Sequence, residues 1–174
     1  GATGWYGKDK RLVNTIHYDR LNRELARMVA TLDPERMFWP SSPCGGPNSF
    51  NDGWHDDSCG DMHYWEVWHG GVPFTTYRQK RFRFCSEYGF ESFPSMKTIR
   101  TFAREEDLNC FSRVMENHQK CRGGNGKILR YLADNYLYPA AFENLVYASQ
   151  LLQADAIKYG VEHFRRQRGY CMGS

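Results

Sequence analysis

The residue best placed to do chemistry in this sequence is Glu87, which ends the stretch RFRFCSE at residues 81–87. Residue types alternate along this stretch, with Phe82 and Phe84 on one side and the polar residues on the other. Such alternation predicts a β-strand. The apolar side suits packing against helices and the polar side suits the interior of a barrel, so we expect Glu87 to reach a pocket at the carboxyl end of the strand.

A carboxylate in this position has a defined chemical use. Small Ser86 precedes Glu87 and Tyr88 follows it, so the Tyr88 hydroxyl could donate a hydrogen bond to the carboxylate. In a retaining glycosidase, such a group attacks the anomeric carbon while a second carboxylic acid about 5 Å away protonates the leaving oxygen. The alternative is a structural ion pair, which also places carboxylates at strand ends.

A second group of candidate residues lies at positions 61–69, DMHYWEVWH. Trp65, Trp68 and Tyr64 could form a wall on which a sugar stacks, because sugar sites combine apolar surface with a few polar groups. His63 could bond a sugar hydroxyl or the nucleophile. The alternative interpretation is an aromatic core strand that carries a hydrogen-bonded histidine.

Metal and phosphate sites are less well supported. The turn at residues 123–126 lacks the preceding strand and the Walker spacing, so we expect a turn before a helix, from which Asn125 or Lys127 could reach a pocket rim. No metal and no cofactor are expected. Six possible metal ligands lie close in sequence without a zinc spacing, and the simpler reading is a solvated loop: His55, Asp56, Asp57, Cys59, Asp61 and His63.

Composition excludes some classes of partner. A net charge of +3, a pI near 8.5 and dispersed basic residues are too weak for a nucleic-acid surface. No stretch has the length of a transmembrane helix, so no membrane is expected, and the compartment stays open. The six cysteines are scattered, without a C-x-x-C pair, which favours mostly free thiols in a core.

The periodicity along the chain predicts one α/β arrangement without a linker. Residues 44–60 are rich in Gly, Pro, Asn, Asp and Ser and predict a long loop of the kind that is usually functional. Short strands are predicted at 37–40, 61–65 and 81–87. Helices are predicted at 11–32, 96–103, 105–119, 127–135 and 140–166, with Asp33-Pro34 ending the first and Gly169 following the last.

Several blocks together resemble family 2 glycoside hydrolases of the β-mannosidase type. They lie at residues 32–43, 60–71, 83–94, 118–127 and 151–159, and the resemblance extends from about residue 20 onward. It implies a (β/α)8 TIM barrel, retention of configuration, no cofactor and release of terminal β-linked mannose from an oligosaccharide. It assigns Glu87 as the nucleophile and implies that a sugar pocket is lined by His63, Tyr64, Trp65, Trp68 and Tyr88.

The sequence also departs from that family. The family's acid/base glutamate follows an asparagine, and no Asn-Glu pair occurs here. We therefore expect residues 1–174 to be a partial catalytic barrel domain, with about strands five to seven, lacking strands one to four and strand eight, and inactive without the remainder of the enzyme. A non-catalytic sugar-binding or interaction module, or an exo-β-glucosaminidase or β-galactosidase, stays open as an alternative.

Overall fold

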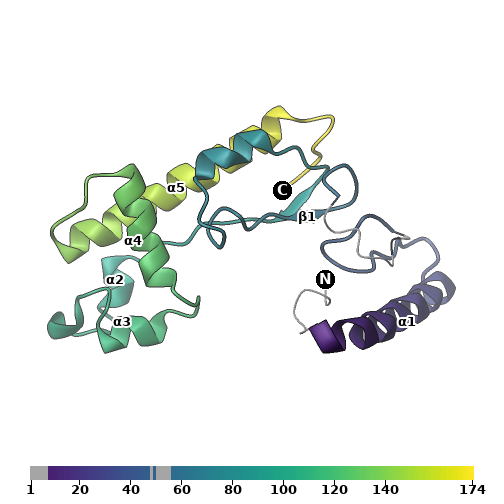
Figure 1. Ribbon diagram of the computed structural model, residues 1–174, viewed down its shortest axis with the longest axis horizontal. Coiled ribbons are helices and arrows are strands. Elements are labelled where there is room, and N and C mark those ends of the chain that lie inside the picture. The colour runs from purple at the N-terminus through teal and green to yellow at the C-terminus, as the bar shows by residue number, and fades with distance from the viewer. Residues whose placement is uncertain (1–7, 48, 50–55) are drawn as a thin grey trace. The chain divides into compact units, whose positions relative to one another are not determined.

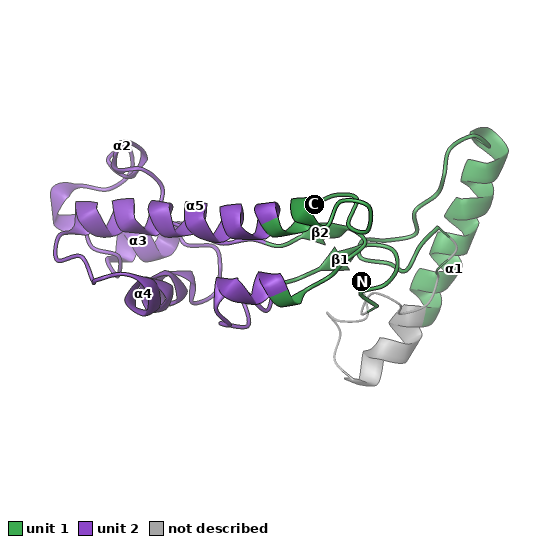
Figure 2. Ribbon diagram, turned by 90° about the horizontal axis from the view of Figure 1, so that it is seen from above, with its two compact units in different colours: residues 1–64, 79–88, 163–174 green, residues 65–78, 89–162 purple. Residues whose placement is uncertain are grey.

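The computed structural model describes residues 8–47, 49 and 56–174, with side chains from Ile16 onward. The chain divides into two compact units (Figure 2). Unit 1 comprises residues 1–64, 79–88 and 163–174, and unit 2 comprises residues 65–78 and 89–162. Each unit gathers segments that are distant in the sequence, and each is described by itself.

Unit 1 begins with helix α1, Lys8–Leu32 (Figure 1). The helix predicted at 11–32 is confirmed, and it ends before Pro34, whose ring disfavours a helical conformation in the residue before it. The Asp33 amide still donates to the Val29 carbonyl at 2.8 Å. The apolar stripe that predicted α1 stays between 39% and 78% exposed, so within the described residues it does not form a core: Ile16, Leu21, Leu25, Met28 and Leu32.

The sheet of unit 1 pairs strand β1, Met62–His63, with strand β2, Cys85–Glu87, in parallel. Met62 lies opposite Cys85 and His63 lies opposite Glu87, so β2 carries one extra residue, Ser86, between the two pairs. An extra residue of this kind is a bulge, which re-aims the side chain that follows it.

The other edge of β2 is occupied as well. The Met172 amide donates to the Arg83 carbonyl at 2.9 Å, and the Cys85 amide donates to the Gly173 carbonyl at 3.1 Å. The stretch around β2 therefore has hydrogen-bonded neighbours on both sides, as an interior strand of a larger sheet has.

The strand predicted at 37–40 is wrong, because the described backbone is irregular there. The segment that reaches the β1 side is a few residues later, where the Asp61 amide donates to the Cys44 carbonyl at 2.9 Å. Pro40 and Pro43 lack the amide hydrogen that a paired strand needs, which explains why regular pairing fails here.

The strand predicted at 81–87 begins only at Cys85, and its alternation is incomplete. Arg81 and Arg83 do share a side, since their guanidinium groups lie 3.9 and 4.7 Å from the Tyr170 ring centre. Phe82 is 1% exposed whereas Phe84 is 42% exposed, so these two rings do not share one buried face. The strand is too short to impose one environment on each side.

The core of unit 1 is aromatic. The Phe82 ring lies 5.6 Å from Tyr64 and 5.8 Å from Phe164, which is the usual separation of packed rings. The His163 ring and the Gln167 amide both contact the Lys80 carbonyl, at 2.8 and 3.0 Å. These contacts hold the residues that precede β2 against the C-terminal end of helix α5, Phe142–Arg166.

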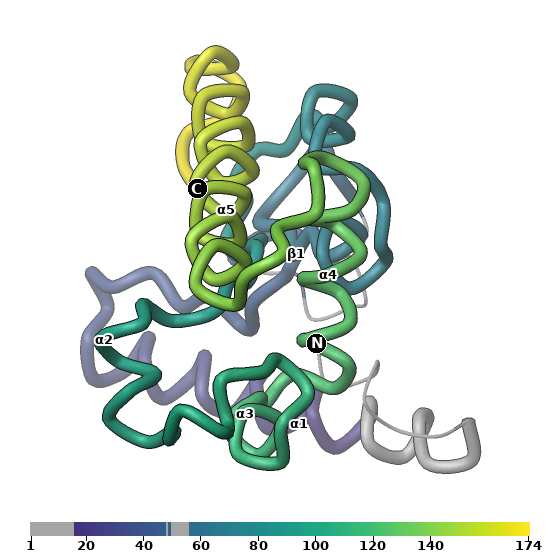
Figure 3. Tube along the Cα trace, turned by 90° about the vertical axis from the view of Figure 1, so that its left-hand side faces the viewer, coloured from purple at the N-terminus to yellow at the C-terminus, as the bar shows by residue number. Residues whose placement is uncertain are grey.

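Unit 2 consists mainly of helices, and most of them are short beside helix α5, Phe142–Arg166 (Figure 3). The predicted helix at 105–119 is interrupted because the Ser112 hydroxyl accepts the Met115 amide and starts a new helix there. No helix in the described part of the chain is long and apolar enough to cross a membrane. The helices are η3 Phe74–Gln79, α2 Met96–Ile99, η4 Glu105–Asp107, α3 Arg113–His118, α4 Gly124–Asn135 and α5 Phe142–Arg166.

The segment that follows Gly89 is held against α5 by hydrogen bonds. The Phe93 amide donates to the Ser149 hydroxyl at 3.1 Å, and the Gln153 side chain donates to the Phe90 carbonyl at 2.6 Å. Ser149 is 1% exposed, so these bonds satisfy backbone groups that would otherwise be buried without partners. The polar positions of α5 therefore fix the backbone of residues 90–93.

Candidate active site

Glu87 stands opposite His63 across the sheet of unit 1. The Nδ1 atom of His63 lies 3.2 Å from Oε2 of Glu87. The bulge at Ser86 produces this pairing, because it places Glu87 rather than Ser86 beside His63. The Glu87 side chain is 50% exposed and that of His63 is 18% exposed, so the carboxylate is held on one side and reachable by a ligand on the other.

Behind this pair lies a buried carboxylate, Asp61, which is 6% exposed. It accepts hydrogen bonds from Trp39 Nε1 at 3.1 Å, the Cys44 amide at 2.8 Å, Ser42 Oγ at 2.6 Å and Ser86 Oγ. Burial alone would raise the pKa of Asp61, but these four donors outweigh it and lower the pKa below its ordinary value. Asp61 is therefore held as a carboxylate.

In the sequence, Asp61 opens the candidate group at residues 61–69 and is one of the possible metal ligands, but no pattern predicts its contacts with Ser42 and Ser86. A cavity of about 290 Å³ opens on this cluster. The local signal was weak, since serines are common beside strands and turns. The cavity is lined by Trp39, Ser42, Gly60, Asp61, Phe84 and Ser86.

The tyrosines predicted to line the site lie beneath and beside it. Tyr64 is 5% exposed, and its amide donates to the Glu87 carbonyl at 2.7 Å. Tyr88 packs on Phe164 with ring centres 5.3 Å apart, and its hydroxyl is 3.2 Å from Ser174 Oγ. Burial raises the pKa of the Tyr88 phenol. Both tyrosines support the Glu87 segment by packing and backbone contacts.

The two tryptophans predicted for the sugar wall belong to unit 2 and differ in environment. Trp65 is half-buried, with its ring 5.0 Å from His69. Trp68 is 3% exposed, and its ring stacks on Tyr131 at 6.1 Å. Its φ of 75° lies in the left-handed region, and its amide donates to the Tyr131 hydroxyl at 3.0 Å. Of the two rings, Trp65 presents the more accessible surface.

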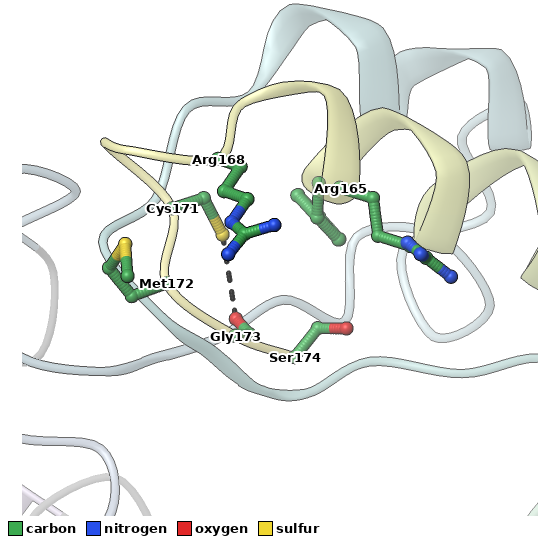
Figure 4. Close-up of a pocket in the computed structure, with 7 residues that line it drawn as sticks. Arg165, Arg168, Cys171, Met172, Gly173 and Ser174 are labelled. Carbon is green, nitrogen blue, oxygen red and sulfur yellow. Dashed lines mark hydrogen bonds between the residues drawn. The ribbon is translucent and has the colours of Figure 1, made fainter.

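A second cavity of unit 1, of about 320 Å³, lies at the end of the chain (Figure 4). Arg168 lies over Cys171, whose thiol donates to the Gly173 carbonyl at 3.4 Å, whereas Arg165 points away from them. No carboxylate lines this cavity among the described residues. Its described lining therefore lacks the carboxylate side chain that glycoside hydrolysis needs.

The alternatives of a metal site and a phosphate site receive no support from the geometry of the described residues. His55 lies outside the described residues, and in the part of the chain that can be placed, no three His, Cys, Asp or Glu side chains converge on one point. Asp56 instead accepts two hydrogen bonds from Ser58, at 2.8 and 2.5 Å. Lys127 lies 3.0 Å from the His69 Nδ1 atom. All six cysteines are free thiols, as predicted.

Comparison with known proteins identifies related sequences, although no family model matches the chain. β-Mannosidase B of Aspergillus flavus is 35% identical over 162 residues, which are 90% of this chain and 18% of that protein. β-Mannosidase B of Aspergillus terreus is 34% identical over 155 residues, which are 86% of this chain and 18% of that protein.

A solved structure gives the same result. The crystal structure of β-D-mannosidase from Dictyoglomus thermophilum matches with a TM-score of 0.75 and 40% identity, over 84% of this chain and 18% of that chain. The predicted resemblance to β-mannosidases is confirmed, and an α/β glycosidase segment is the fold class that it supports. The chain spans 18% of the length of these relatives.

Proposed function

We propose that this chain supplies the nucleophile of a retaining glycosidase that releases terminal β-linked mannose, and that Glu87 is that nucleophile. The observation that carries the proposal is the placement of a half-exposed Glu87 carboxylate at the end of a parallel strand, 3.2 Å from His63. Catalytic groups of α/β barrels occupy the carboxyl ends of strands. The resemblance to proteins named β-mannosidase supports the choice of substrate.

The acid/base partner would come from polypeptide outside residues 1–174. A retaining mechanism needs a protonated carboxylic acid about 5 Å from the nucleophile. Asp61 is unsuited to that role, because four donors hold it as a carboxylate and it is 6% exposed. We infer that the remainder of a longer enzyme completes the site, as the 18% coverage of the relatives suggests.

Two features fit such a larger enzyme. The first is the exposed apolar stripe of α1, because exposed apolar stripes are typical of surfaces that other elements cover: Ile16, Leu21, Leu25, Met28 and Leu32. The stretch around β2 is already paired on both edges, which fits an interior position in a barrel sheet. A TIM barrel with these segments as about strands five to seven is therefore the architecture we propose.

The sugar would contact the side of Glu87 that is open to solvent. In this proposal, His63 hydrogen-bonds the nucleophile Glu87. Trp65 stacks on the sugar, because its ring keeps accessible surface. Tyr64 and Tyr88 would support the Glu87 segment by packing within unit 1. Trp68, which is buried within unit 2, would contribute by packing there. The alternative of a non-catalytic sugar-binding module has no observation in its favour. A β-glucosaminide or β-galactoside substrate is the alternative within the enzyme class.

Covalent trapping tests this proposal. The natural polypeptide that carries residues 1–174, at whatever length it is encoded, is incubated with a 2-deoxy-2-fluoro-β-mannosyl fluoride, which forms a long-lived glycosyl ester. Mass spectrometry of the digest is expected to locate the label in the peptide around Glu87. Glu87→Gln should abolish labelling, and Glu35→Gln, an exposed control, should retain it. A label on another carboxylate would overturn the assignment.

A further inference from the structure

A continuous line of hydrogen-bonding groups runs from the buried Asp61 carboxylate to Glu87. Ser42 Oγ lies 2.6 Å from Asp61 Oδ2 and 2.9 Å from His63 Nε2. The other ring nitrogen of His63 lies 3.2 Å from Glu87 Oε2. All four residues belong to unit 1: Ser42, Asp61 and His63 come from its first segment, residues 1–64, and Glu87 comes from its second, residues 79–88.

The direction of each hydrogen bond follows from counting hydrogens. Ser42 has one hydroxyl hydrogen, and Asp61, held as a carboxylate by four donors, can only accept. The Ser42 hydrogen therefore points at Asp61, which is nearer than the next acceptor, Ser86 Oγ at 3.3 Å. Ser42 Oγ then faces His63 with a lone pair, and Nε2 of His63 must carry a hydrogen to bond it.

The same count applies at the other ring nitrogen. A neutral His63 with its hydrogen on Nε2 would turn the Nδ1 lone pair toward Glu87 Oε2, and two acceptors at 3.2 Å repel. A second hydrogen must lie between them. Because a nucleophilic carboxylate has to be ionised, that hydrogen belongs on Nδ1, and His63 donates from both nitrogens.

We propose that Asp61, Ser42 and His63 form a proton-fixing chain that aims the Nδ1–H of His63 at Glu87 and so orients the ionised nucleophile. The proposal rests on the proposed function of Glu87. His63 contacts the reacting carboxylate, whereas Ser42 and Asp61 are positioning residues that act through His63. No local sequence pattern predicts this role for Ser42 or Asp61.

The proton-fixing chain of Asp61, Ser42 and His63 transfers no proton during the reaction. In glycosylation, an electron pair of the Glu87 carboxylate forms the bond to the anomeric carbon, the glycosidic C–O bond breaks, and the leaving oxygen takes its electron pair and a proton from the acid outside this chain. In deglycosylation, water attacks the anomeric carbon and gives a proton to the conjugate base of that same acid, the ester C–O bond breaks, and Glu87 recovers its carboxylate with the electron pair of that bond. The His63 Nδ1–H stabilises that charge as it returns.

The test compares the trapping rates of Ser42 variants in the natural polypeptide that carries residues 1–174, with the same fluoro-mannosyl fluoride. Ser42→Ala removes the hydroxyl that links Asp61 to His63. The saturating rate constant for labelling Glu87 should fall about 10- to 100-fold, the range for a lost hydrogen bond to a charged group. The reagent concentration at half-maximal rate should stay the same, since Ser42 does not bind the sugar.

Rescue and control variants separate this role from a merely structural one. Ser42→Thr keeps the hydroxyl and should restore the rate to within a few fold of wild type. Ser41→Ala removes a neighbouring hydroxyl that donates to the Pro43 carbonyl at 3.1 Å, and this variant should label at the wild-type rate. If Ser42→Ala does not fold, Ser42→Cys replaces it and should show the same loss, because a thiol is a weak donor and acceptor.

The two proposals fail in different ways. A wild-type polypeptide that never carries the label on Glu87 overturns the proposed function and the proton-fixing chain with it. A wild-type polypeptide that labels Glu87 while Ser42→Ala labels equally fast overturns the proton-fixing chain alone. A rate lost in Ser42→Ala and not recovered in Ser42→Thr also contradicts it, since the hydroxyl would then not be the group that matters.

Discussion

Gly60 lies against the Cys44 carbonyl so closely that a Cβ atom at position 60 would overlap the carbonyl oxygen. Its φ of 60° also lies in the left-handed region. We expect Gly60→Ala to destabilise the protein by more than about 3 kcal/mol. The backbone at Cys44 must move to make room for the new Cβ atom, and the alanine must also adopt a left-handed φ. Gly169→Ala is the matched control in unit 1, with φ of 98° but open space around it, and should cost about 1–2 kcal/mol.

Urea unfolding of both variants checks this prediction. Gly60 directly precedes Asp61, so its close contact with Cys44 also fixes the position of the buried Asp61 carboxylate. Equal losses in the two variants would contradict the importance of the close approach and leave only the backbone conformation as the cause.

Asp61→Asn should destabilise the protein by about 2–3 kcal/mol at neutral pH, because an amide puts hydrogens where hydrogen-bond donors already point. Asp61 has a pKa lowered by its donors, so its contribution is present above the ordinary value of 3.8 and is lost as pH falls through the lowered pKa. The stability gap between wild type and Asp61→Asn should therefore narrow on acidification. Exposed Asp57→Asn serves as the control, and a gap that widens toward low pH would refute the sign.

Glu91 is expected to behave in the opposite way. Its Oε2 atom is buried and has no hydrogen-bond partner in the described part of the chain, and burial raises its pKa despite the Gln119 hydrogen bond and the Lys127 charge. Stability from this group is present below the ordinary pKa of 4.5 and is lost as pH rises through the raised pKa. Glu91→Gln should stabilise the protein at neutral pH by about 1 kcal/mol.

Thermal unfolding from acidic to neutral pH measures this effect. The advantage of Glu91→Gln should shrink on acidification, while Glu106→Gln, in an exposed ion pair with Arg104, should change stability little at any pH. A destabilised Glu91→Gln at neutral pH would argue that the Lys127 charge outweighs the burial of the carboxylate.

The thiols should differ in reactivity. Cys85 is 0% exposed, and burial, followed by the nearby Cys171, raises its pKa to about 12. Because the thiolate is the reactive form, iodoacetamide at neutral pH should modify partly exposed Cys121 first and Cys85 only after unfolding. Peptide mapping by mass spectrometry over time distinguishes the two, and comparable rates in the folded protein would contradict the burial of Cys85.

Substitutions of Trp65 and Trp68, the two tryptophans of the predicted sugar wall, should affect different properties of the protein. Trp65→Ala should raise KM about tenfold, equivalent to ~1.4 kcal/mol of lost binding, while Trp65→Phe retains most of it. Trp68→Ala should instead lower stability by about 3–5 kcal/mol, as expected for a buried aromatic residue. Kinetics and unfolding on the same samples decide the matter, and a stability loss in Trp65→Ala larger than in Trp68→Ala would reverse the assignment.

The long helices could be read from the sequence because one stripe of apolar residues spans each of them. The bounds of α1 and α5 follow that stripe closely. Helix α1 ends directly before Asp33, and α5 ends at Arg166, shortly before Gly169. The break within 105–119 was missed because Ser112 fits a helix interior on spacing alone. It acts as a cap only through its bond to the Met115 amide. Short strands were harder still, since tertiary pairing decides whether two or three residues count as β-structure.

The residues of the site also differ in whether local sequence predicts them. Glu87 and His63 were recognisable because each lies within a short stretch of distinctive neighbours. Ser42 was not, since its contacts to Asp61 and Ser86 join residues 19 and 44 positions apart, and no local pattern records such a distance. The bulge at Ser86, which sets Glu87 opposite His63, depends on pairing between strands and is equally invisible to periodicity.

The double pairing around β2 has a consequence for how the protein is made. Residues 83–85 need the carbonyl of Gly173 and the amide of Met172 as well as the β1 side. Ribosomes add residues at about 5–20 per second, so Glu87 emerges several seconds before Gly173 does. During that interval one edge of its strand has no neighbour, and the newly made chain passes through a period in which the segment that carries Glu87 can be captured by chaperones or pair wrongly.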